Sequence, residues 1–259
     1  MKICIYASDL AIITGHNHYQ DKNELYLKMW KKHYPIDFQK IFLETSQTIE
    51  INEISQEELK LSEKLNNALD SKNVSELKDK KEILMKEIKD SVNKDILKQH
   101  INSTLNKNFG IKHENSAISA YTKKTNDTVS IIEKFMKKSL YRTKNHVWYL
   151  GGRIDGITEN NTIIEIKNRV NNLFYTLREY EKIQAYAYMY IMETNKAKLV
   201  ESLQNNKINI NILDIVYEDH YWNTIIDPKI KKFIKDFEKF MKDINRKKQL
   251  IGILFGTHS

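Results

Sequence analysis

A short apolar run near the middle of the chain carries two charged residues at alternate positions. Residues 163–169 read IIEIKNR, so Glu165 and Lys167 stand two residues apart. On a β-strand, alternate side chains share a face, so these two point one way and Ile164 and Ile166 point the other. Lys and Glu are rarely buried unless they are paired or functional. We therefore expect Glu165 and Lys167 to serve a functional site.

A second carboxylate, Asp155, precedes this run and follows the sequence GGRI. The segment 146–169 reads as two strands joined by a polar Glu-Asn-Asn turn, a hairpin that brings Asp155 to the same edge as Glu165. Converging carboxylates repel one another unless a cation is present. Mg²⁺ takes hard oxygen ligands, usually one or two carboxylates with waters and substrate phosphate. The arrangement predicts a magnesium site, with Lys167 placed to neutralise charge on a reacting phosphate.

The order Asp, then Glu-x-Lys on a strand, resembles the PD-(D/E)XK nuclease superfamily. Three further segments are similar to one branch of it, the lambda-exonuclease-like (YqaJ) viral recombinase family. They are FGIKHENSAISAY (109–121), YASDLAIITGHNHY (6–19) and IQAYAYMY (183–190). In that family they correspond to a helix with a metal-binding Glu, a Ser-containing helix with a Gly-x-Asn-x-Tyr turn, and a Gln-x-x-x-Tyr helix. The four motifs stand in the family's order and cover most of the chain outside residues 45–105.

The resemblance implies a role for each matching residue. Glu114, Asp155, Glu165 and the carbonyl of Ile166 are the implied ligands of Mg²⁺, for which Mn²⁺ is an expected substitute. The implied catalytic residues are Glu114, Asp155, Glu165 and Lys167. The expected substrate-binding residues are Ser8, Asn17, Arg153, Gln184 and Tyr188, of which Arg153 offers a guanidinium fork suited to phosphate.

The chain departs from the family pattern in three places. Arg153 stands where a small residue is usual, two positions before the metal-binding Asp. Asn168 and Arg169 follow the Glu-x-Lys triplet where Cys-Pro or a similar pair is usual. Residues 45–105 match nothing specific in the family.

Composition sets broad limits. The chain has 259 residues, a formal net charge of +8 and a single cysteine, Cys4. The positive charge favours a polyanionic partner such as nucleic acid, although a composition rich in Lys, Asn and Ile produces the same excess. One cysteine excludes a disulfide framework, a thiolate zinc site and a four-cysteine iron–sulfur cluster within the chain. The apolar start of the chain is too short and interrupted to span a membrane, so we expect a protein that is not secreted and is cytoplasmic, or in the host compartment of viral DNA replication.

The elements that position these residues follow from periodicity. Neither proline nor glycine occurs between Pro35 and Gly110, and apolar residues recur every three or four positions from Leu59 to Ile96. A polar break at 70–75 predicts two helices folded back as a hairpin. Downstream, we expect an aromatic-striped helix over 177–193, a half-buried strand over 207–219 and an amphipathic helix over 228–248, with Ile244 on its apolar face. Together with the resemblance, these elements predict an α/β fold: a PD-(D/E)XK nuclease-like central mixed sheet flanked by helices, with a long helical N-terminal half.

The sequence thus predicts one nuclease domain over 1–259, with a helical insertion or hairpin at about 45–105. The expected activity is Mg²⁺-dependent hydrolysis of DNA, as a 5′-to-3′ exonuclease on double-stranded DNA with a free end, in viral or phage recombination, replication or repair. The resemblance implies a single-strand annealing protein as partner and a ring-shaped homotrimer, and no membrane partner. Two alternatives stay open: a structure-specific or restriction-type endonuclease on the same fold, and a catalytically inactive DNA-binding or scaffold protein.

Overall fold

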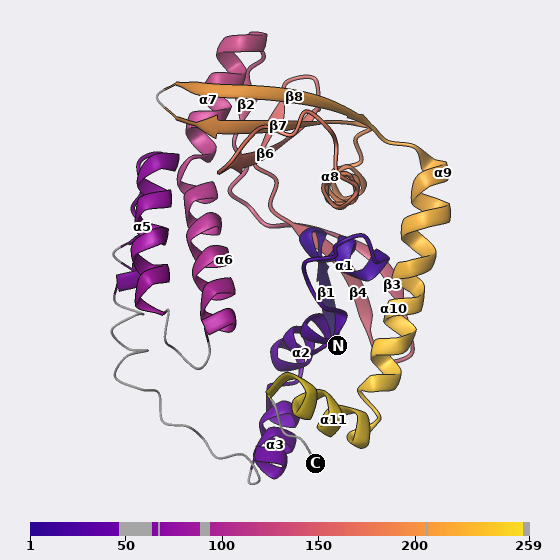
Figure 1. Cartoon of the computed structure of the whole chain (residues 1–259). Helices are drawn as coiled ribbons and strands as arrows, with labels where there is room; N and C mark the ends of the chain where they lie inside the picture. The colour runs from indigo at the N-terminus through magenta and orange to yellow at the C-terminus, as the bar shows by residue number, and fades with distance from the viewer. Residues whose placement is uncertain (47–63, 67, 89–93, 206, 256–259) are drawn as a thin grey trace.

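Two β-sheets lie on either side of one buried helix, α8 (Glu179–Met192), as Figure 1 shows. The computed structural model describes residues 1–46, 64–66, 68–88, 94–205 and 207–255. The three-stranded sheet has the order β1-β4-β3, and the five-stranded sheet has the order β2-β5-β6-β7-β8. Their strands are β1 (Lys2–Tyr6), β3 (Met136–Arg142) and β4 (Val147–Gly152), and β2 (Val129–Ser130), β5 (Gly156–Thr158), β6 (Ile163–Arg169), β7 (Lys196–Gln204) and β8 (Ile208–Val216).

Helices cover both sheets and extend the fold at its two ends (Figure 1). The longer ones are α1 (Leu10–Thr14), α2 (Lys22–His33), α3 (Pro35–Ser46), α5 (Val74–Glu87), α6 (Lys94–Lys112), α7 (Glu114–Thr125), α10 (Asp227–Phe240) and α11 (Ile244–Phe255). Single turns form η1 (Ala7–Asp9), α9 (Asp219–Tyr221) and η2 (Trp222–Ile226). Both sheets combine parallel and antiparallel pairs, which confirms the α/β class with mixed sheets flanked by helices. Of the helices that the structure describes, none has the length and apolar character needed to cross a membrane.

The strand β6 is covered on both faces. Its side chains Ile164 and Ile166 are buried in a small core with Ala117 and Tyr121 of α7. The opposite face of β6 lies toward α8 and carries Glu165 and the other alternate residues. β6 pairs along its whole length with β7 in parallel, and its first two residues, Ile163 and Ile164, pair also with β5 in antiparallel. The sequence therefore predicts the facing of β6 correctly, although β7 itself is absent from the predicted elements.

The chain changes sheets between β4 and β5. β4 pairs with β1 and β3 in the first sheet, whereas β5 pairs with β2 and β6 in the second. Between them lie residues 153–155, which belong to no strand. The predicted single strand before the Glu-Asn-Asn turn is therefore wrong: it is divided into β4 and the short β5, which is the hairpin partner of β6, and Asp155 stands just before β5. Two consecutive glycines, Gly151 and Gly152, leave room for the close packing at this crossing.

The helical region is a hairpin of α5 and α6 with its own core. Leu77 and Leu84 of α5 pack with Ile101, Leu105 and Phe109 of α6. The predicted break at 70–75 is present. α5 ends at Glu87 and α6 begins at Lys94, so the helix after the break does not run on to Ile96 as the apolar repeat predicts. Two members of the apolar repeat, Leu59 and Val92, lie outside the described residues.

The C-terminal amphipathic segment is two helices instead of one. Phe233, Phe237 and Phe240 of α10 are buried against Tyr26 of α2, as the apolar stripe predicts. The helix stops after Phe240, and Asp243 accepts a hydrogen bond from the Arg246 N–H at 3.0 Å, which caps the start of α11. Ile244 is consequently 57% exposed and not part of the apolar face as expected.

For two glycines in these elements, Gly152 and Gly110, we expect substitution by alanine to change the free energy of unfolding in opposite directions. A Cβ at Gly152 would lie 2.6 Å from Cε1 of the buried Tyr188 and 3.2 Å from Cβ of Ala7, so we expect Gly152→Ala to lower the free energy of unfolding by about 1–3 kcal/mol. A Cβ at Gly110, inside α6, would meet nothing within 4 Å, so Gly110→Ala should raise it by about 0.5–1 kcal/mol. Urea unfolding followed by circular dichroism measures both. Equal effects of the two changes would contradict the packing at the β4–α8 contact.

Candidate active site

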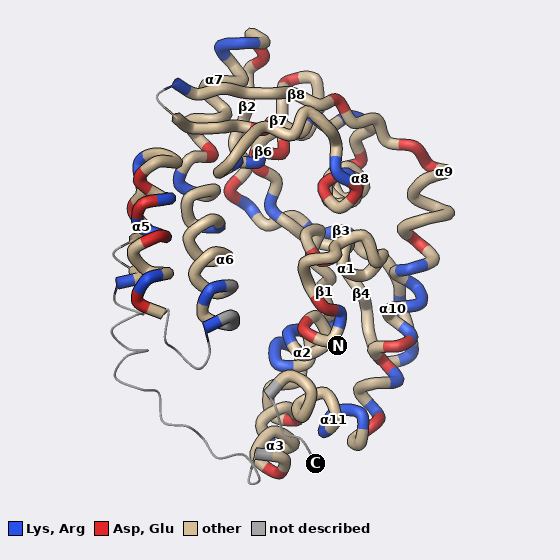
Figure 2. The backbone as a smooth tube through the Cα atoms, in the orientation of Figure 1, with Lys and Arg blue, Asp and Glu red and all other residues tan. Residues whose placement is uncertain are grey.

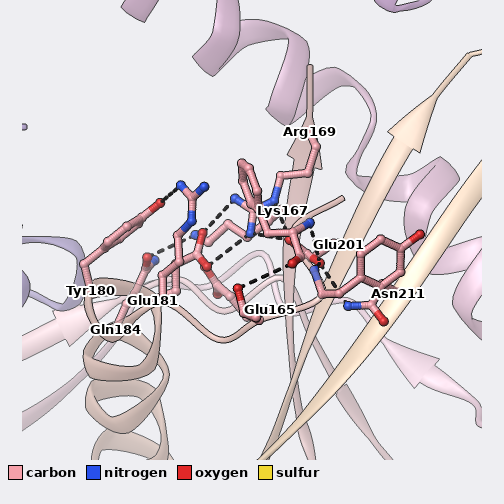
Figure 3. Close-up of polar contacts among 12 residues, drawn as sticks. Glu165, Lys167, Arg169, Tyr180, Glu181, Gln184, Glu201 and Asn211 are labelled. Atoms are coloured by element: carbon pink, nitrogen blue, oxygen red, sulfur yellow. Dashed lines mark hydrogen bonds and ion pairs between the residues drawn. The ribbon is translucent and has the colours of Figure 1, made fainter. Parts of the chain in front are cut away.

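The polar face of β6 holds a chain of hydrogen bonds that continues onto α8 (Figure 3). The Lys167 Nζ donates to Glu165 Oε1 at 2.7 Å and to Gln184 Oε1 at 3.1 Å. One turn along α8, the Gln184 Nε2 donates to the Tyr188 hydroxyl at 3.0 Å. Four of the residues singled out in the sequence are therefore in contact, because β6 places alternate side chains on one face and α8 presents positions four apart to that face.

Asp155 reaches this group from the crossing between the sheets. Its Oδ2 accepts a hydrogen bond from the backbone N–H of Ile166 at 2.7 Å. The bond holds the Asp155 carboxylate beside the segment that carries Glu165 and Lys167. The antiparallel pairing of Gly156 with Ile164 sets this position, because it brings the start of β5 next to the middle of β6.

The electrostatics of the two carboxylates reflect burial. Burial raises the pKa of Asp155 to about 6, and the charge of Glu114 adds to the rise, although the Ile166 N–H opposes it. Burial raises the pKa of Glu165 to about 7, and Asp155 adds to it against the effect of Lys167. Burial alone would lower the pKa of Lys167, but its contact with Glu165 reverses this and leaves that pKa raised overall. Lys167 is therefore a cation at neutral pH.

Glu114 approaches from the other side of the sheet. It begins α7, and its carboxylate lines a cavity of about 250 Å³ together with Ile166 and Lys167. Burial raises the pKa of Glu114, the charge of Arg153 opposes the rise, and the charge of Glu165 adds to it. Even so, among the described residues no three His, Cys, Asp or Glu side chains form a group that could hold a metal ion. Glu114 thus borders the same cavity without joining Asp155 and Glu165 in a three-carboxylate cluster.

The donor set nevertheless fits a divalent cation. Glu165 is 2% exposed, and its Oε2 is buried with no hydrogen-bond partner among the described residues. A buried carboxylate oxygen without a partner is costly, because desolvation of its charge is uncompensated. Mg²⁺ commonly binds through one or two carboxylates and keeps waters in its other positions. The free oxygen of Glu165 and the adjacent Asp155 carboxylate meet that requirement.

The other predicted substrate-binding residues lie around this centre. Arg153 is exposed, and its charge lowers the pKa of both Glu114 and Asp155. Ser8 is exposed in η1, which packs against α8 and β4. Asn17 uses its side chain within its own turn: Oδ1 accepts from the Tyr19 N–H at 2.9 Å. No contact of Ser8 or Asn17 with the two carboxylates is recorded within the described part of the chain, so their roles stay predictions.

A buried ion cluster extends the site along β6, and the sequence does not predict it. Arg169 donates to Glu181 of α8 through Nη1 at 2.7 Å and Nη2 at 3.1 Å, and to Glu201 of β7 through Nε at 2.9 Å (Figure 3). Glu181 is 1% exposed and Glu201 is 0% exposed. Arg169 stands two residues after Lys167, as Lys167 stands two after Glu165, and this alternation could have predicted that Arg169 lies on the same face of the strand. Glu201 had no such signal, because β7 was not expected.

Glu201 also anchors the loop between β6 and α8. It accepts hydrogen bonds from the N–H groups of Phe174 at 3.1 Å and Tyr175 at 3.0 Å, and from Asn211 of β8 at 2.9 Å. Arg169 stacks on the Phe174 ring at 4.5 Å. These bonds lower the pKa of Glu201 despite its burial, which by itself acts in the raising direction. The cluster therefore ties β6, β7, β8 and α8 together next to Lys167.

The sequence model of the YqaJ-like viral recombinase domain matches residues 62–197, more than half of the chain. The chain belongs to this family. The matched range contains Glu114, Asp155, Glu165, Lys167 and Gln184, whereas Ser8 and Asn17 precede it. It also contains α5 and most of α6 within the segment 45–105, where no specific motif of the family is present.

Solved structures show a partial likeness to this chain. An alkaline exonuclease (LHK-Exo) from Laribacter hongkongensis is 14% identical, with 70% of this chain and 88% of that chain covered and a TM-score of 0.44. A phage-related exonuclease from Haemophilus somnus 129PT is 12% identical, with 98% and 96% covered and a TM-score of 0.45. No curated protein matches the sequence.

The buried cluster predicts a large cost for losing its cation. We expect Arg169→Met to lower the free energy of unfolding by about 3–5 kcal/mol, because two buried carboxylates lose their counter-charge. Arg169→Lys should recover only part of it, since an ammonium lacks the fork that reaches both partners. Urea denaturation of the purified variants provides the measurement. Lys198→Met, which removes a pair with the 75% exposed Asp214, is the control and should cost less than about 1 kcal/mol.

The raised pKa of Asp155 predicts how stability depends on pH without metal. Between pH about 4 and 6 the folded state holds a proton that the unfolded state releases, so stability falls as pH rises through this window. In EDTA, the free energy of unfolding of Asp155→Asn should fall over this pH window by on the order of 2 kcal/mol less than that of the wild type. Chemical denaturation at pH 4.5, 6 and 7.5 tests this. The control Asp214→Asn should keep the wild-type profile, and an Asp155→Asn profile parallel to wild type would refute the shift.

Proposed function

We propose that this protein is a Mg²⁺-dependent deoxyribonuclease that hydrolyses phosphodiester bonds of DNA. The proposal is carried by one observation. Asp155, from the crossing before β5, meets Glu165 and Lys167 of β6 where a buried carboxylate oxygen has no hydrogen-bond partner among the described residues. Membership of a viral recombinase domain family supports a DNA substrate.

The residues that would hold the ion are Asp155, Glu165 and the carbonyl of Ile166. Glu114 lines the adjoining cavity and is proposed as a further ligand, direct or through water. When bound, a divalent cation stabilises negative charge on the phosphoryl oxygens and makes water a better nucleophile. Mn²⁺, which accepts the same oxygen ligands, is proposed as a substitute.

Lys167 supplies a fixed positive charge beside the reacting phosphate. Its raised pKa keeps it protonated, so it stabilises charge in the transition state and does not act as a general base. Gln184 orients the ammonium through Oε1, while its Nε2 is engaged by Tyr188. Gln184 and Tyr188 thus position Lys167 from α8, and their effect on substrate is proposed to act through that contact.

The cavity beside the carboxylates suits a nucleic-acid strand. Lys107 and Asn106 of α6 and Asn168 of β6 line it together with Glu114 and Lys167. Asn168 is held by a 2.7 Å hydrogen bond from its Nδ2 to the Gly110 carbonyl, and its Oδ1 is buried without a partner among the described residues. Arg153 and Ser8 are proposed to contact phosphates at the rim, and Asn17 to shape the neighbouring turn.

The finer assignment follows the family. We propose a 5′-to-3′ exonuclease on double-stranded DNA with a free end, in viral or phage recombination, replication or repair. We propose a single-strand annealing protein as its partner. We also propose that the chain assembles as a homotrimer. The chain is proposed to form one nuclease domain over 1–259, with the α5–α6 hairpin as its helical addition.

Removal of Lys167 or Asp155 tests the chemistry. We expect Lys167→Ala and Asp155→Asn each to reduce release of acid-soluble nucleotides from linear duplex DNA at least about 100-fold, because each removes charge at the reacting phosphate. EDTA should abolish the activity, and added Mg²⁺ should restore it. The matched control Lys198→Ala, on the neighbouring strand, should keep wild-type rates. Unchanged, Mg²⁺-independent degradation by both site variants would refute the enzyme assignment.

The same assay decides the finer assignment. An exonuclease of 5′-to-3′ polarity degrades linear duplex, spares covalently closed circles and prefers a 5′-phosphate to a 5′-hydroxyl. Rapid cutting of closed circles would instead establish an endonuclease on this fold. Binding of DNA with no cleavage at any end would establish a binding protein.

A further inference from the structure

A basic surface lies along α10, apart from the candidate active site. A cavity of about 400 Å³ there is lined by Arg142 at the end of β3 and by Lys231, Lys235, Lys239 and Lys242 along and just after α10. All five cations are exposed. We call this set the basic groove. Figure 2 shows Lys and Arg recurring along α10 in this part of the molecule.

The lysines of the basic groove form one stripe. Lys231, Lys235 and Lys239 are four residues apart and share one side of the helix, and Lys242, in the turn just after α10, lines the same cavity. At 1.5 Å per residue the three helical lysines span about 12 Å. The other side of α10 buries Phe233, Phe237 and Phe240. Like charges four apart disfavour a helix, so an anionic ligand along the stripe would relieve that repulsion.

Carboxylates of the chain leave most of this charge uncompensated. Lys231 pairs with Asp227 at 2.7 Å, whereas Arg142, Lys235, Lys239 and Lys242 make no ion pair in the part of the chain that the structure describes. Among the described residues that line the groove, Glu238 is the one carboxylate. It accepts hydrogen bonds from Thr143 at 2.5 Å and His146 at 2.6 Å, so it is already engaged.

Those two hydrogen bonds also give the basic groove its shape. Thr143 and His146 belong to the turn between β3 and β4, and Glu238 belongs to α10. The His146 Nε2 in turn contacts the Tyr34 hydroxyl at 2.6 Å. The turn is therefore held against α10, which places Arg142 opposite the lysine stripe. The groove is a built concavity and not only a row of lysines on a helix.

β4 separates the basic groove from the candidate active site. The β3–β4 turn lies at the start of β4, and Asp155 lies three residues beyond its end. At about 3.3 Å per residue, the six residues of β4 span about 20 Å. A double helix has phosphates all along such a length, whereas a mononucleotide product does not reach both places.

We propose that the basic groove binds the phosphate backbone of duplex DNA, at a distance from the residues that cleave it. This inference rests on the proposed function, because that function makes DNA the substrate. A membrane surface is disfavoured, since binding at a bilayer needs exposed apolar side chains and Ile234, which lines the groove, is 4% exposed. The groove would hold the duplex without sequence preference.

The test compares two triple substitutions that remove the same charge. Lys235→Gln, Lys239→Gln and Lys242→Gln together remove the three of its four lysines that make no ion pair among the described residues. Lys40→Gln, Lys196→Gln and Lys207→Gln together remove three exposed lysines elsewhere. Binding to a fluorescent duplex of about 30 base pairs is measured by anisotropy in EDTA, where no hydrolysis occurs, over a series of KCl concentrations.

We expect the stripe variant to bind roughly tenfold more weakly at low salt, with the salt slope reduced by about one per lysine that contacts a phosphate. The control variant should change affinity less than about twofold. A variant with Lys235→Arg, Lys239→Arg and Lys242→Arg keeps the positive charge and should bind DNA as the wild type does. That result would show that the loss of charge causes the weaker binding. With Mg²⁺, the stripe variant should raise KM for long duplex and leave kcat unchanged.

Equal affinity of the stripe and control variants would overturn the proposal. So would a loss of binding to phosphatidylserine vesicles with DNA affinity unchanged. Because binding is measured without cleavage, failure of the nuclease assignment is a separate result: a chain that never cleaves but loses DNA affinity through the stripe keeps the basic groove.

Discussion

The coverage of β6 on both faces constrains the whole centre of the molecule. α7 closes one face over Ile164 and Ile166, and α8 closes the other over the charged residues. Charged groups on a strand so enclosed have little water to solvate them: the Glu165 side chain is 3% exposed and that of Lys167 is 23% exposed. Each must find a partner inside the protein or bind one from outside. The chain of contacts from Glu165 through Lys167 to Gln184 is the consequence.

Charge balance around β6 makes this constraint specific. The buried carboxylates Glu165, Glu181 and Glu201 face two cations, Lys167 and Arg169. Arg169 satisfies two of the acids, and Lys167 satisfies one oxygen of the third. Asp155 then adds a further negative charge at the same edge. The remaining excess is negative and lies at the free oxygen of Glu165, which is the physical basis for a cation there.

The crossing between the two sheets determines where the second carboxylate stands. Because the chain leaves β4 at Gly152 and enters β5 at Gly156, Asp155 falls in a short segment free of strand pairing. Its side chain can therefore turn toward the Ile166 N–H. α8 lies between the sheets and holds both in place, so the position of Asp155 depends on the packing of Tyr188 against Gly152. The long aromatic helix is thus part of the site as well as the core.

The sequence alone determined the local facts: the two faces of β6, the aromatic helix α8, the strand β8, the apolar stripe of α10, and the identity of Asp155, Glu165 and Lys167 as neighbours. Period-two and helical periodicities carry that information, because they depend only on residues near in the chain. Only the tertiary structure decided that the strands divide into two sheets and that Glu201 of the unforeseen β7 completes the Arg169 cluster. It also decided that Glu114 borders the cavity from the opposite side of the sheet. Those outcomes depend on pairing and burial between distant segments, which no local pattern encodes.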